Sequence, residues 1–87
     1  LESDDASVTF FPNPATSFVT FNVTASENNT ASLTLLDLSG RTLKKENYQF
    51  NEGLNNGKID VSNYARGVYM IQLVFDGKTV MKKVVLE

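Results

Sequence analysis

The sequence predicts an all-β protein: a seven-stranded antiparallel immunoglobulin-like β-sandwich made of two sheets. Three observations predict this fold. Short runs of alternating apolar and polar residues recur along the chain, and a period of two is typical of half-buried strands. Glycine, asparagine and proline separate these runs at intervals of about 8–12 residues, as in small sandwich domains. No segment shows a strong helical pattern.

The first two predicted strands lie on either side of a proline-rich stop. Residues 8–11 form a short apolar run that ends at Pro12, Asn13 and Pro14. Because proline has no N–H to donate to a ladder, this strand must end or bend at a sheet edge. Residues 17–25 then alternate, and one face carries Val19, Phe21, Val23 and Ala25. We expect that face to be buried.

A tight turn follows the third predicted strand. Residues 31–35 alternate again, and residues 37–40 read Asp-Leu-Ser-Gly. Gly40 can adopt the positive φ that a tight turn requires. Asp37, like Asp60 further along, is expected to accept hydrogen bonds from backbone N–H groups of its own turn.

The middle of the chain is poorer in apolar residues. Residues 41–48 are predicted to form a fourth strand near an edge, where Lys44 and Lys45 oppose pairing with another chain. Residues 51–57 hold two glycines and three asparagines, and this composition predicts a loop. A short strand is expected at residues 58–61.

The last third of the chain gives the strongest pattern. Residues 62–66 are expected to form a single helical turn, with Ser62 as N-cap and Gly67 as its stop. Residues 68–75 then alternate and place Tyr69, Ile71, Leu73 and Phe75 toward the core. Asp76 and Gly77 give a hairpin signal, and residues 78–86 form the last strand.

Composition excludes several classes of function. The chain has 87 residues, enough for one small core, and a net charge of −2, which disfavours nucleic acid as a partner. It has no cysteine, histidine or tryptophan. Thiolate and histidine catalysis, disulfides and the usual metal ligands are therefore absent, and no acidic pair is fixed at catalytic spacing. We expect no enzyme activity, metal, cofactor or small-molecule substrate.

Three blocks of residues, in this order, carry a resemblance to a known family. They are Phe11-Pro12-Asn13-Pro14-Ala15, residues 33–41 (LTLLDLSGR), and residues 59–73 (IDVSNYARGVYMIQL) followed by Lys82-Lys83-Val84-Val85. Their spacing and their position near the end of the chain resemble the C-terminal sorting domain (type A) of cargo proteins of the Bacteroidetes type IX (Por) secretion system. The resemblance covers residues 8–87.

The resemblance implies a secretion signal. Such a domain directs an upstream passenger protein through the outer-membrane translocon, with shuttle proteins as further partners. A cell-surface sortase-like peptidase then usually cuts before the domain, and the passenger is attached to the surface or released into the medium. Residues 1–7 would be the linker from the passenger and would contain the cut. Because the chain begins at Leu1, we interpret it as part of a longer protein.

The resemblance places the recognition signal on the last strand. The residues concerned are Lys82, Lys83, Val84 and Val85. On an alternating strand the two lysines point to opposite faces, and either recognition or protection of a sheet edge would explain them. Recognition could include addition of this strand to a partner's sheet. The other motif residues are interpreted as mainly structural: Pro12, Asn13, Pro14, Asp37, Gly40, Gly67 and Tyr69.

Two alternatives to a sorting signal stay open. A carbohydrate-binding or adhesive sandwich would use Tyr48, Phe50 and Tyr64, the aromatic residues expected to be exposed. A structural spacer domain would have no partner. Leu36, Met70 and Val74 are expected to point away from the core, and a contiguous patch of them would favour docking or self-association. A homodimer formed through an exposed last strand is also compatible with the sequence.

Overall fold

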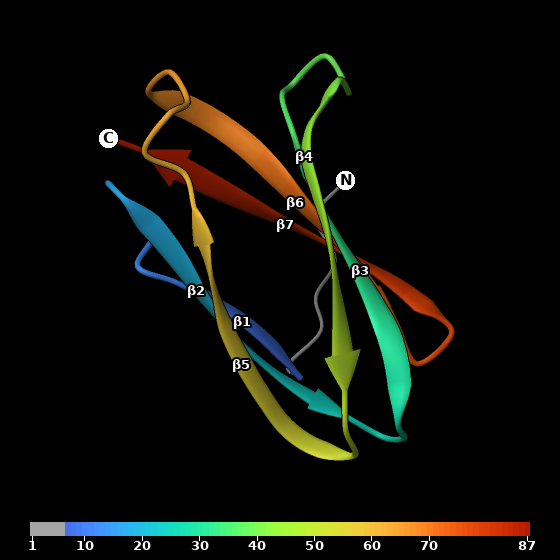
Figure 1. Cartoon of the computed structure of the whole chain (residues 1–87). Helices are drawn as coiled ribbons and strands as arrows, with labels where there is room; N and C mark the ends of the chain where they lie inside the picture. The colour runs from blue at the N-terminus through green and yellow to red at the C-terminus, as the bar shows by residue number, and fades with distance from the viewer. Residues whose placement is uncertain (1–6) are drawn as a thin grey trace.

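A computed structural model describes residues 7–87, which form seven strands and no helix (Figure 1). The strands are β1 (Val8–Phe11), β2 (Phe18–Ala25), β3 (Asn29–Leu36), β4 (Thr42–Phe50), β5 (Gly53–Asp60), β6 (Gly67–Phe75) and β7 (Lys78–Leu86). All pairs of neighbouring strands are antiparallel. The predicted class, all-β with seven strands, is confirmed. The predicted linker lies, except for its last residue, outside the described residues.

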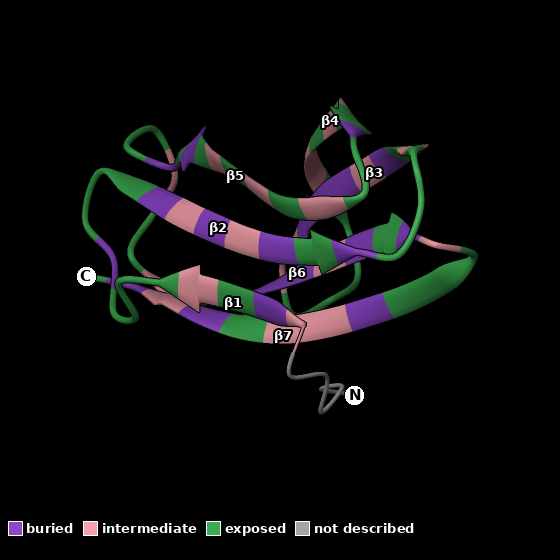
Figure 2. Cartoon of the chain, turned by 90° about the horizontal axis from the view of Figure 1, so that it is seen from below, coloured by how far each residue is buried: buried purple, intermediate pink, exposed green. Residues whose placement is uncertain are grey.

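The strands form two facing sheets (Figure 2). One sheet has three strands in the order β1-β2-β5, and the other has four in the order β4-β3-β6-β7. In the constant-type immunoglobulin arrangement the fourth strand joins the sheet of the first, second and fifth. Here β4 pairs with β3 instead, so the prediction of two antiparallel sheets is confirmed, whereas the immunoglobulin-like assignment stays a prediction.

The core lies between the two sheets and is filled by alternate side chains of each strand. The two inward faces predicted from the alternation are confirmed, because all their members are buried: Val19, Phe21, Val23 and Ala25 on β2, and Tyr69, Ile71, Leu73 and Phe75 on β6. Phe21 and Phe50 lie 6.1 Å apart between ring centroids, and Phe50 and Phe75 lie 6.0 Å apart. The contact of Phe21 with Phe50 joins the two sheets, and that of Phe50 with Phe75 lies within the four-stranded sheet.

The predicted loop at residues 51–57 is wrong, because β5 begins at Gly53. This strand pairs with β2 along its whole length, and Gly57 lies opposite Phe21. A Cβ at position 57 would come within 2.6 Å of the Phe21 ring. The glycine that suggested a loop therefore makes room for a core aromatic ring, and pairing with β2 outweighs the low strand propensity of the asparagines.

The predicted helical turn at residues 62–66 is also wrong, since the structure has non-helical turns there. Asp60 Oδ1 accepts hydrogen bonds from the N–H (2.9 Å) and the hydroxyl (2.6 Å) of Ser62. Asp60 is thus the turn acceptor that the sequence predicted, and Ser62 is a donor rather than an N-cap.

The predicted hairpin at Asp76 and Gly77 is confirmed, because the two residues have positive φ values of 53° and 71°.

The sandwich has two open sides, each flanked by one edge strand from each sheet. Strands β1 and β7 flank one side, and Figure 2 shows them next to each other. Strands β4 and β5 flank the other side, which faces the viewer in Figure 1. On the β1/β7 side, Ala15 forms a parallel bridge with Leu86. This contact places the Phe11–Ala15 block, the first of the three family blocks, against the last strand.

Candidate functional site

The four residues of the predicted recognition signal lie on β7 and divide between its two faces. Lys82 and Val84 are on the face that points between the sheets, with Val80 and Leu86. Val84 is completely buried, at 0% exposure, while Lys82 is half-buried. Lys83 is exposed and Val85 half-buried on the outer face. Of the two lysines, Lys82 is therefore the one on the core side of β7.

Lys82 avoids the apolar interior because it lies at the open β1/β7 side. It lines a shallow hollow with Val8, Phe10 and Asn13 among its walls. The long methylene chain of a lysine can cover apolar side chains while its ammonium group stays in water. Of the two oppositely oriented lysines, Lys82 therefore lies at the rim of the core.

The segment of residues 12–15, here called the edge cap, covers the outer edge of β7. The side chain of Asn13 forms two hydrogen bonds: Nδ2 donates to the carbonyl of Lys83 (3.1 Å), and Oδ1 accepts from the N–H of Val85 (3.0 Å). Ala15 continues the ladder, because its N–H donates to Val85 O and its carbonyl accepts from Glu87 N, both at 2.8 Å. The Asn13 amide thus takes the place of a strand backbone.

The flanking prolines account for this use of a side chain. Pro12 and Pro14 have no backbone N–H to donate, so the ladder at this point depends on the amide of Asn13. Ala15 is 0% exposed, which shows how closely the end of the edge cap fits against β7. The sequence correctly placed the two prolines at a sheet edge but did not show that the edge cap bonds to β7.

Arg66 joins Thr16, the residue directly after the edge cap, to the β5–β6 turn and the end of the chain. Its Nη1 donates to the carbonyls of Thr16 (2.7 Å) and Glu87 (3.4 Å). Its Nη2 donates to the carbonyls of Val61 (3.0 Å) and Tyr64 (2.5 Å). A planar guanidinium with five donors is suited to such a convergence of carbonyl groups.

Sequence analysis missed this role of Arg66. The residue was noticed only as the end of an expected helical turn. Its position directly before Gly67, in the third block of the family resemblance, was the available signal. Thr16 is 50 residues away in the sequence, so the contact depends on the tertiary fold.

Tyr69 and Gly67 support the same corner of the molecule. Tyr69 is 8% exposed, as a core aromatic should be, and its hydroxyl donates to the carbonyl of Ala65. The hydroxyl therefore has the partner that burial requires. Gly67 begins β6 with a φ of 152° and pairs with Leu86. Tyr69 pairs with Val84, so these two motif residues lie directly beside β7.

The turn of Asp37 and Gly40 is a separate structural device. Asp37 Oδ1 accepts from Ser39 N, Ser39 Oγ and Arg41 N, and Oδ2 lies 3.1 Å from Arg41 Nε. The hydroxyl of Ser39, followed by the N–H of Arg41, lowers the pKa of Asp37 below its usual value. Gly40 has a φ of 90°, as a left-handed turn position requires. Both residues thus shape the turn between β3 and β4.

The aromatic residues considered for carbohydrate binding do not form an exposed platform. The prediction is wrong for Phe50, which is 2% exposed, and Tyr48 and Tyr64 are half-buried against the core. Burial, followed by a hydrogen bond to Glu46, raises the pKa of Tyr48 well above its usual range. The aromatic side chains that are exposed are Phe11 and Phe18, both at 41%.

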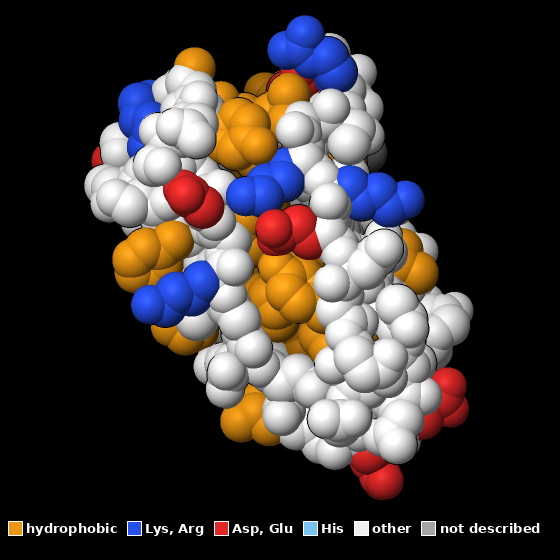
Figure 3. Space-filling model, in the orientation of Figure 1, with side chains coloured by type: hydrophobic (Ala, Val, Ile, Leu, Met, Phe, Trp, Pro, Cys, Tyr) orange, Lys and Arg blue, Asp and Glu red, His pale blue; other side chains and the backbone are white. Residues whose placement is uncertain are grey.

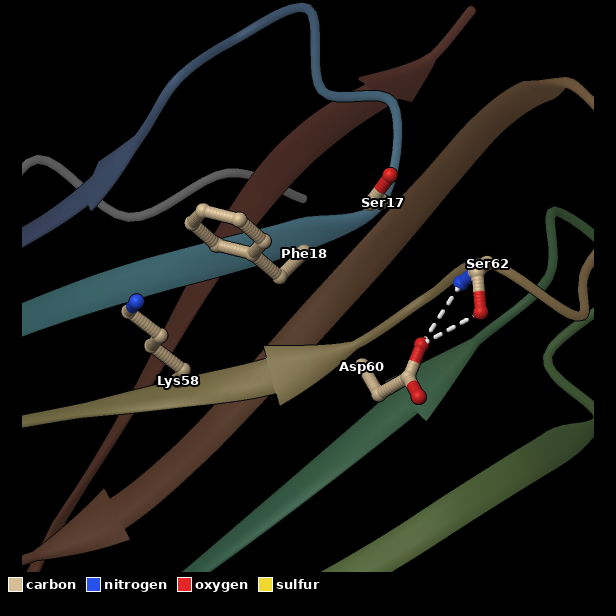
Figure 4. Close-up of a pocket in the computed structure, with 5 residues that line it drawn as sticks. All are labelled: Ser17, Phe18, Lys58, Asp60 and Ser62. Carbon is tan, nitrogen blue, oxygen red and sulfur yellow. Dashed lines mark hydrogen bonds between the residues drawn. The ribbon is translucent and has the colours of Figure 1, made fainter.

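Phe18 borders a shallow hollow of about 490 Å³ on the outer face of the three-stranded sheet (Figure 4). Lys58 Nζ lies 4.5 Å from the centre of its ring, and Asp60 turns away toward Ser62.

The described residues contain no cluster of three or more side chains that could hold a metal ion. Within residues 7–87, no helix has the length and apolar character needed to cross a membrane.

Comparison with known protein families gives a match that covers nearly the whole chain. A family model described as "Secretion system C-terminal sorting domain" matches residues 9–87. This range includes the edge cap, Arg66 and the whole of β7, and it leaves out only the first eight residues. No curated protein matches the chain.

Proposed function

The chain belongs to the family of secretion-system C-terminal sorting domains, and we propose that β7 is the part of it that the type IX translocon recognises. Membership of the family makes the domain a signal for export across the outer membrane. The observation that supports β7 is the hydrogen bonding on its free side. The edge cap, from the first family block, and Arg66, from the third, converge on the end of this strand and on Glu87.

The individual residues of β7 have different roles in this proposal. Lys83 and Val85 are accessible to a partner on the outer face, and Lys82 is accessible at the β1/β7 side. Val84 is buried and acts by holding the strand in the sheet. The motif residues Asn13, Gly67 and Tyr69 position β7 rather than contact the translocon. Asp37 and Gly40 shape a turn of the same sheet.

We further propose the events that follow export. A sortase-like peptidase cuts within residues 1–7, and the passenger is attached to the cell surface or released. The partners are thus the translocon, its shuttle proteins and the peptidase. A second copy of the chain paired through residues 83–87 would have to displace the edge cap. If cleavage occurs, N-terminal sequencing of the domain recovered from an exporting culture should place its first residue at or before Val8.

An export assay tests the proposed function. A periplasmic signal peptide, a folded reporter and residues 1–87 are fused and expressed in a Bacteroidetes host with and without a working type IX system. The reporter is expected at the surface or in the medium only when the system works. The matched control lacks residues 8–87 and should stay in the periplasm. Reporter retained in the periplasm of both hosts, from a fusion whose domain resists protease, would contradict the proposal.

Truncation of β7 is a poor version of this test. Removing residues 82–87 also removes Val84 and Leu86, which are 0% and 1% exposed. Loss of two buried apolar side chains from so small a core would unfold the domain. Failure of export would then report misfolding rather than loss of a signal. Substitutions on the outer face of β7, where the fold is tolerant, separate the two effects.

A further inference from the structure

We propose that the translocon recognises this domain in its folded state, through the outer face of the four-stranded sheet around Lys83 and Val85, while the edge cap stays in place. The surface that binds it combines a carboxylate with an apolar patch. This inference rests on the proposed function and specifies its mechanism. It differs from recognition by strand addition, in which a partner would pair with the edge of β7.

The first argument is that the edge of β7 is already occupied over the recognition residues. Strand addition requires backbone N–H and C=O groups that point outward and lack partners. Four of the outward backbone groups of residues 83–87 are Lys83 O, Val85 N, Val85 O and Glu87 N. Asn13 and Ala15 bond all four at 2.8–3.1 Å. A partner strand would have to break these bonds before it could form its own.

The second argument comes from the side chains that remain accessible. Val84 and Leu86 point into the core and cannot touch a partner of the folded domain. Lys83 and Val85 point to the opposite side, where Lys83 pairs with Met70 and Val85 pairs with Val68 across the β6–β7 ladder. Val68 is 39% exposed. Half of the recognition sequence is therefore presented on one outer surface.

The third argument is the composition of that surface. The ladder register places Leu36 beside Met70, and Met81 beside Gln72, so apolar side chains surround Lys83. The outward strand positions of the whole sheet are residues 30, 32, 34, 36, 42, 45, 47, 49, 68, 70, 72, 74, 79, 81, 83 and 85. The only charged residues among these positions are Lys45 and Lys83.

This charge pattern determines the kind of partner. In a chain with a net charge of −2, one sheet face carries two lysines and no carboxylate at its strand positions. Opposite charges across an interface favour the correct partner and the correct register. Of the three residues expected to point outward, Val74 is 38% exposed and Leu36 half-buried, whereas Met70 is only 8% exposed. The accessible apolar side chains near Lys83 are Val68, at 39% exposure, and the half-buried Val85. A translocon surface with carboxylate and apolar side chains is complementary to this face.

A disulfide that seals the edge cap separates the two modes of recognition. Ala15 and Leu86 are neighbours in a parallel bridge, where backbones lie about 4.8 Å apart, within the range that a disulfide can span. The chain has no cysteine, so Ala15→Cys with Leu86→Cys forms one bridge in the oxidising periplasm. Loss of thiol labelling in the unfolded protein verifies closure, because both positions are buried in the fold. The controls are the two single substitutions, each of which makes one of the two packing changes without the bridge.

The expected result is that the sealed fusion is exported within about twofold of the two single variants. Export of the single variants with retention of the sealed one would overturn the inference, because the translocon would then need an open edge. The proposed function would survive that outcome. If the unmodified fusion itself fails to leave the periplasm, the proposed function falls first, so the two failures are distinguishable.

Charge reversal tests the face itself. Lys83→Glu should lower export by roughly tenfold, because it places a carboxylate against the acidic surface of the partner. The control is Lys58→Glu, which reverses an exposed lysine on the outer face of the other sheet. It should leave export within about twofold. Equal export of both variants, with protease resistance showing that both are folded, would contradict recognition through this face.

Discussion

Different kinds of interaction cover the β1/β7 side and the β4/β5 side of the sandwich. On the β1/β7 side, residues 12–15 add a short piece of ladder to β7, and one of its residues, Ala15, is completely buried. On the β4/β5 side, side chains span the gap: Lys44 Nζ donates to the carbonyl of Asp60 at 3.1 Å, and the Tyr64 hydroxyl donates to the carbonyl of Leu43 at 3.4 Å. Figure 3 shows hydrophobic side chains visible in the hollow on this side, with basic and acidic side chains across it.

This difference shows how a small domain can protect one edge more strictly than another. A lysine on a flexible chain discourages another strand from pairing, but it leaves the backbone groups of the edge in place. The edge cap instead bonds those groups directly. The strand whose edge groups are bonded in this way is β7, which carries the proposed recognition residues. We therefore expect recognition to depend more on the conformation of β7 than on that of β4.

The largest expected effect comes from the buried face of β7. Val84→Ala should lower the free energy of unfolding by about 2 kcal/mol, because it removes two methyl groups from a completely buried site. Its neighbour Val85 points outward, and Val85→Ala should cost no more than about 0.5 kcal/mol. Urea denaturation of both variants measures the difference. Equal losses would show that β7 does not have the two distinct faces described above.

Arg66 gives the next largest effect. Arg66→Lys keeps the charge but loses the planar arrangement of donors that reaches four carbonyls, and we expect a loss of about 1.5 kcal/mol. Lys44→Ala, on the β4/β5 side, removes one hydrogen bond and a long ion pair with Glu46 (4.0 Å), both near the surface, and should cost only about 0.5 kcal/mol. The same denaturation experiment compares them. A larger loss for the Lys44 variant would reverse the proposed ranking of the two sides.

Asn13 tests the edge cap itself. Asn13→Ala should cost about 1 kcal/mol and expose the N–H of Val85 and the carbonyl of Lys83. The matched control is Asn55→Ala, since Asn55 also donates to and accepts from backbone groups, on β5. Only the Asn13 variant should self-associate at high concentration, because only it opens the edge of β7. Light scattering that finds both variants monomeric would argue against the cap.

The smallest effect is the response to acid. Hydrogen bonds from Ser62 lower the pKa of Asp60 below its usual 3.8, and bonds to Ser39 and Ser26 do the same for Asp37 and Asp76. Because the folded state binds these protons less readily than the unfolded state, their contribution is complete above about pH 5. It is lost as the pH falls through 3.8 and then through the lowered pKa values.

Asp60→Asn locates part of that acid response on the β4/β5 side. The loss of stability between pH 5 and pH 2 should be smaller in this variant than in the unmodified chain, as followed by urea denaturation at each pH. Asn13→Ala changes the other side without removing a carboxylate, and its pH dependence should match that of the unmodified chain. An unchanged acid response in the Asp60 variant would show that this carboxylate is not linked to folding.

Much of the fold was predictable because it depends on local patterns. The alternation from Val19 to Ala25 correctly predicted a buried face, and the Asp76-Gly77 pair correctly predicted a hairpin. The failure at residues 51–57 has a physical cause. Strand β5 is formed by pairing with β2, and its residue Gly57 is required by the Phe21 ring rather than by a turn.

The candidate site was predictable only in part. The family blocks identified β7 and the proline segment separately. Their connection could not be found from one sequence, because Asn13 and its partners are 70 and 72 residues apart. The alternation rule showed that Lys82 and Lys83 point to opposite faces. Only the positions of β1 and the edge cap show that Lys82 lies at an open side, where its charge can reach water.

Amide hydrogen exchange at residues 83–87 tests the central claim, that the edge of the recognition strand is closed by the chain itself. Val85 N donates to Asn13 Oδ1 at 3.0 Å, and Glu87 N donates to Ala15 O at 2.8 Å. We predict that both amides in the unmodified domain are protected, and that Val85 loses its protection in Asn13→Ala while the β3–β6 ladder keeps it. Exchange of Val85 at the rate of an unstructured peptide in the unmodified domain would contradict the account.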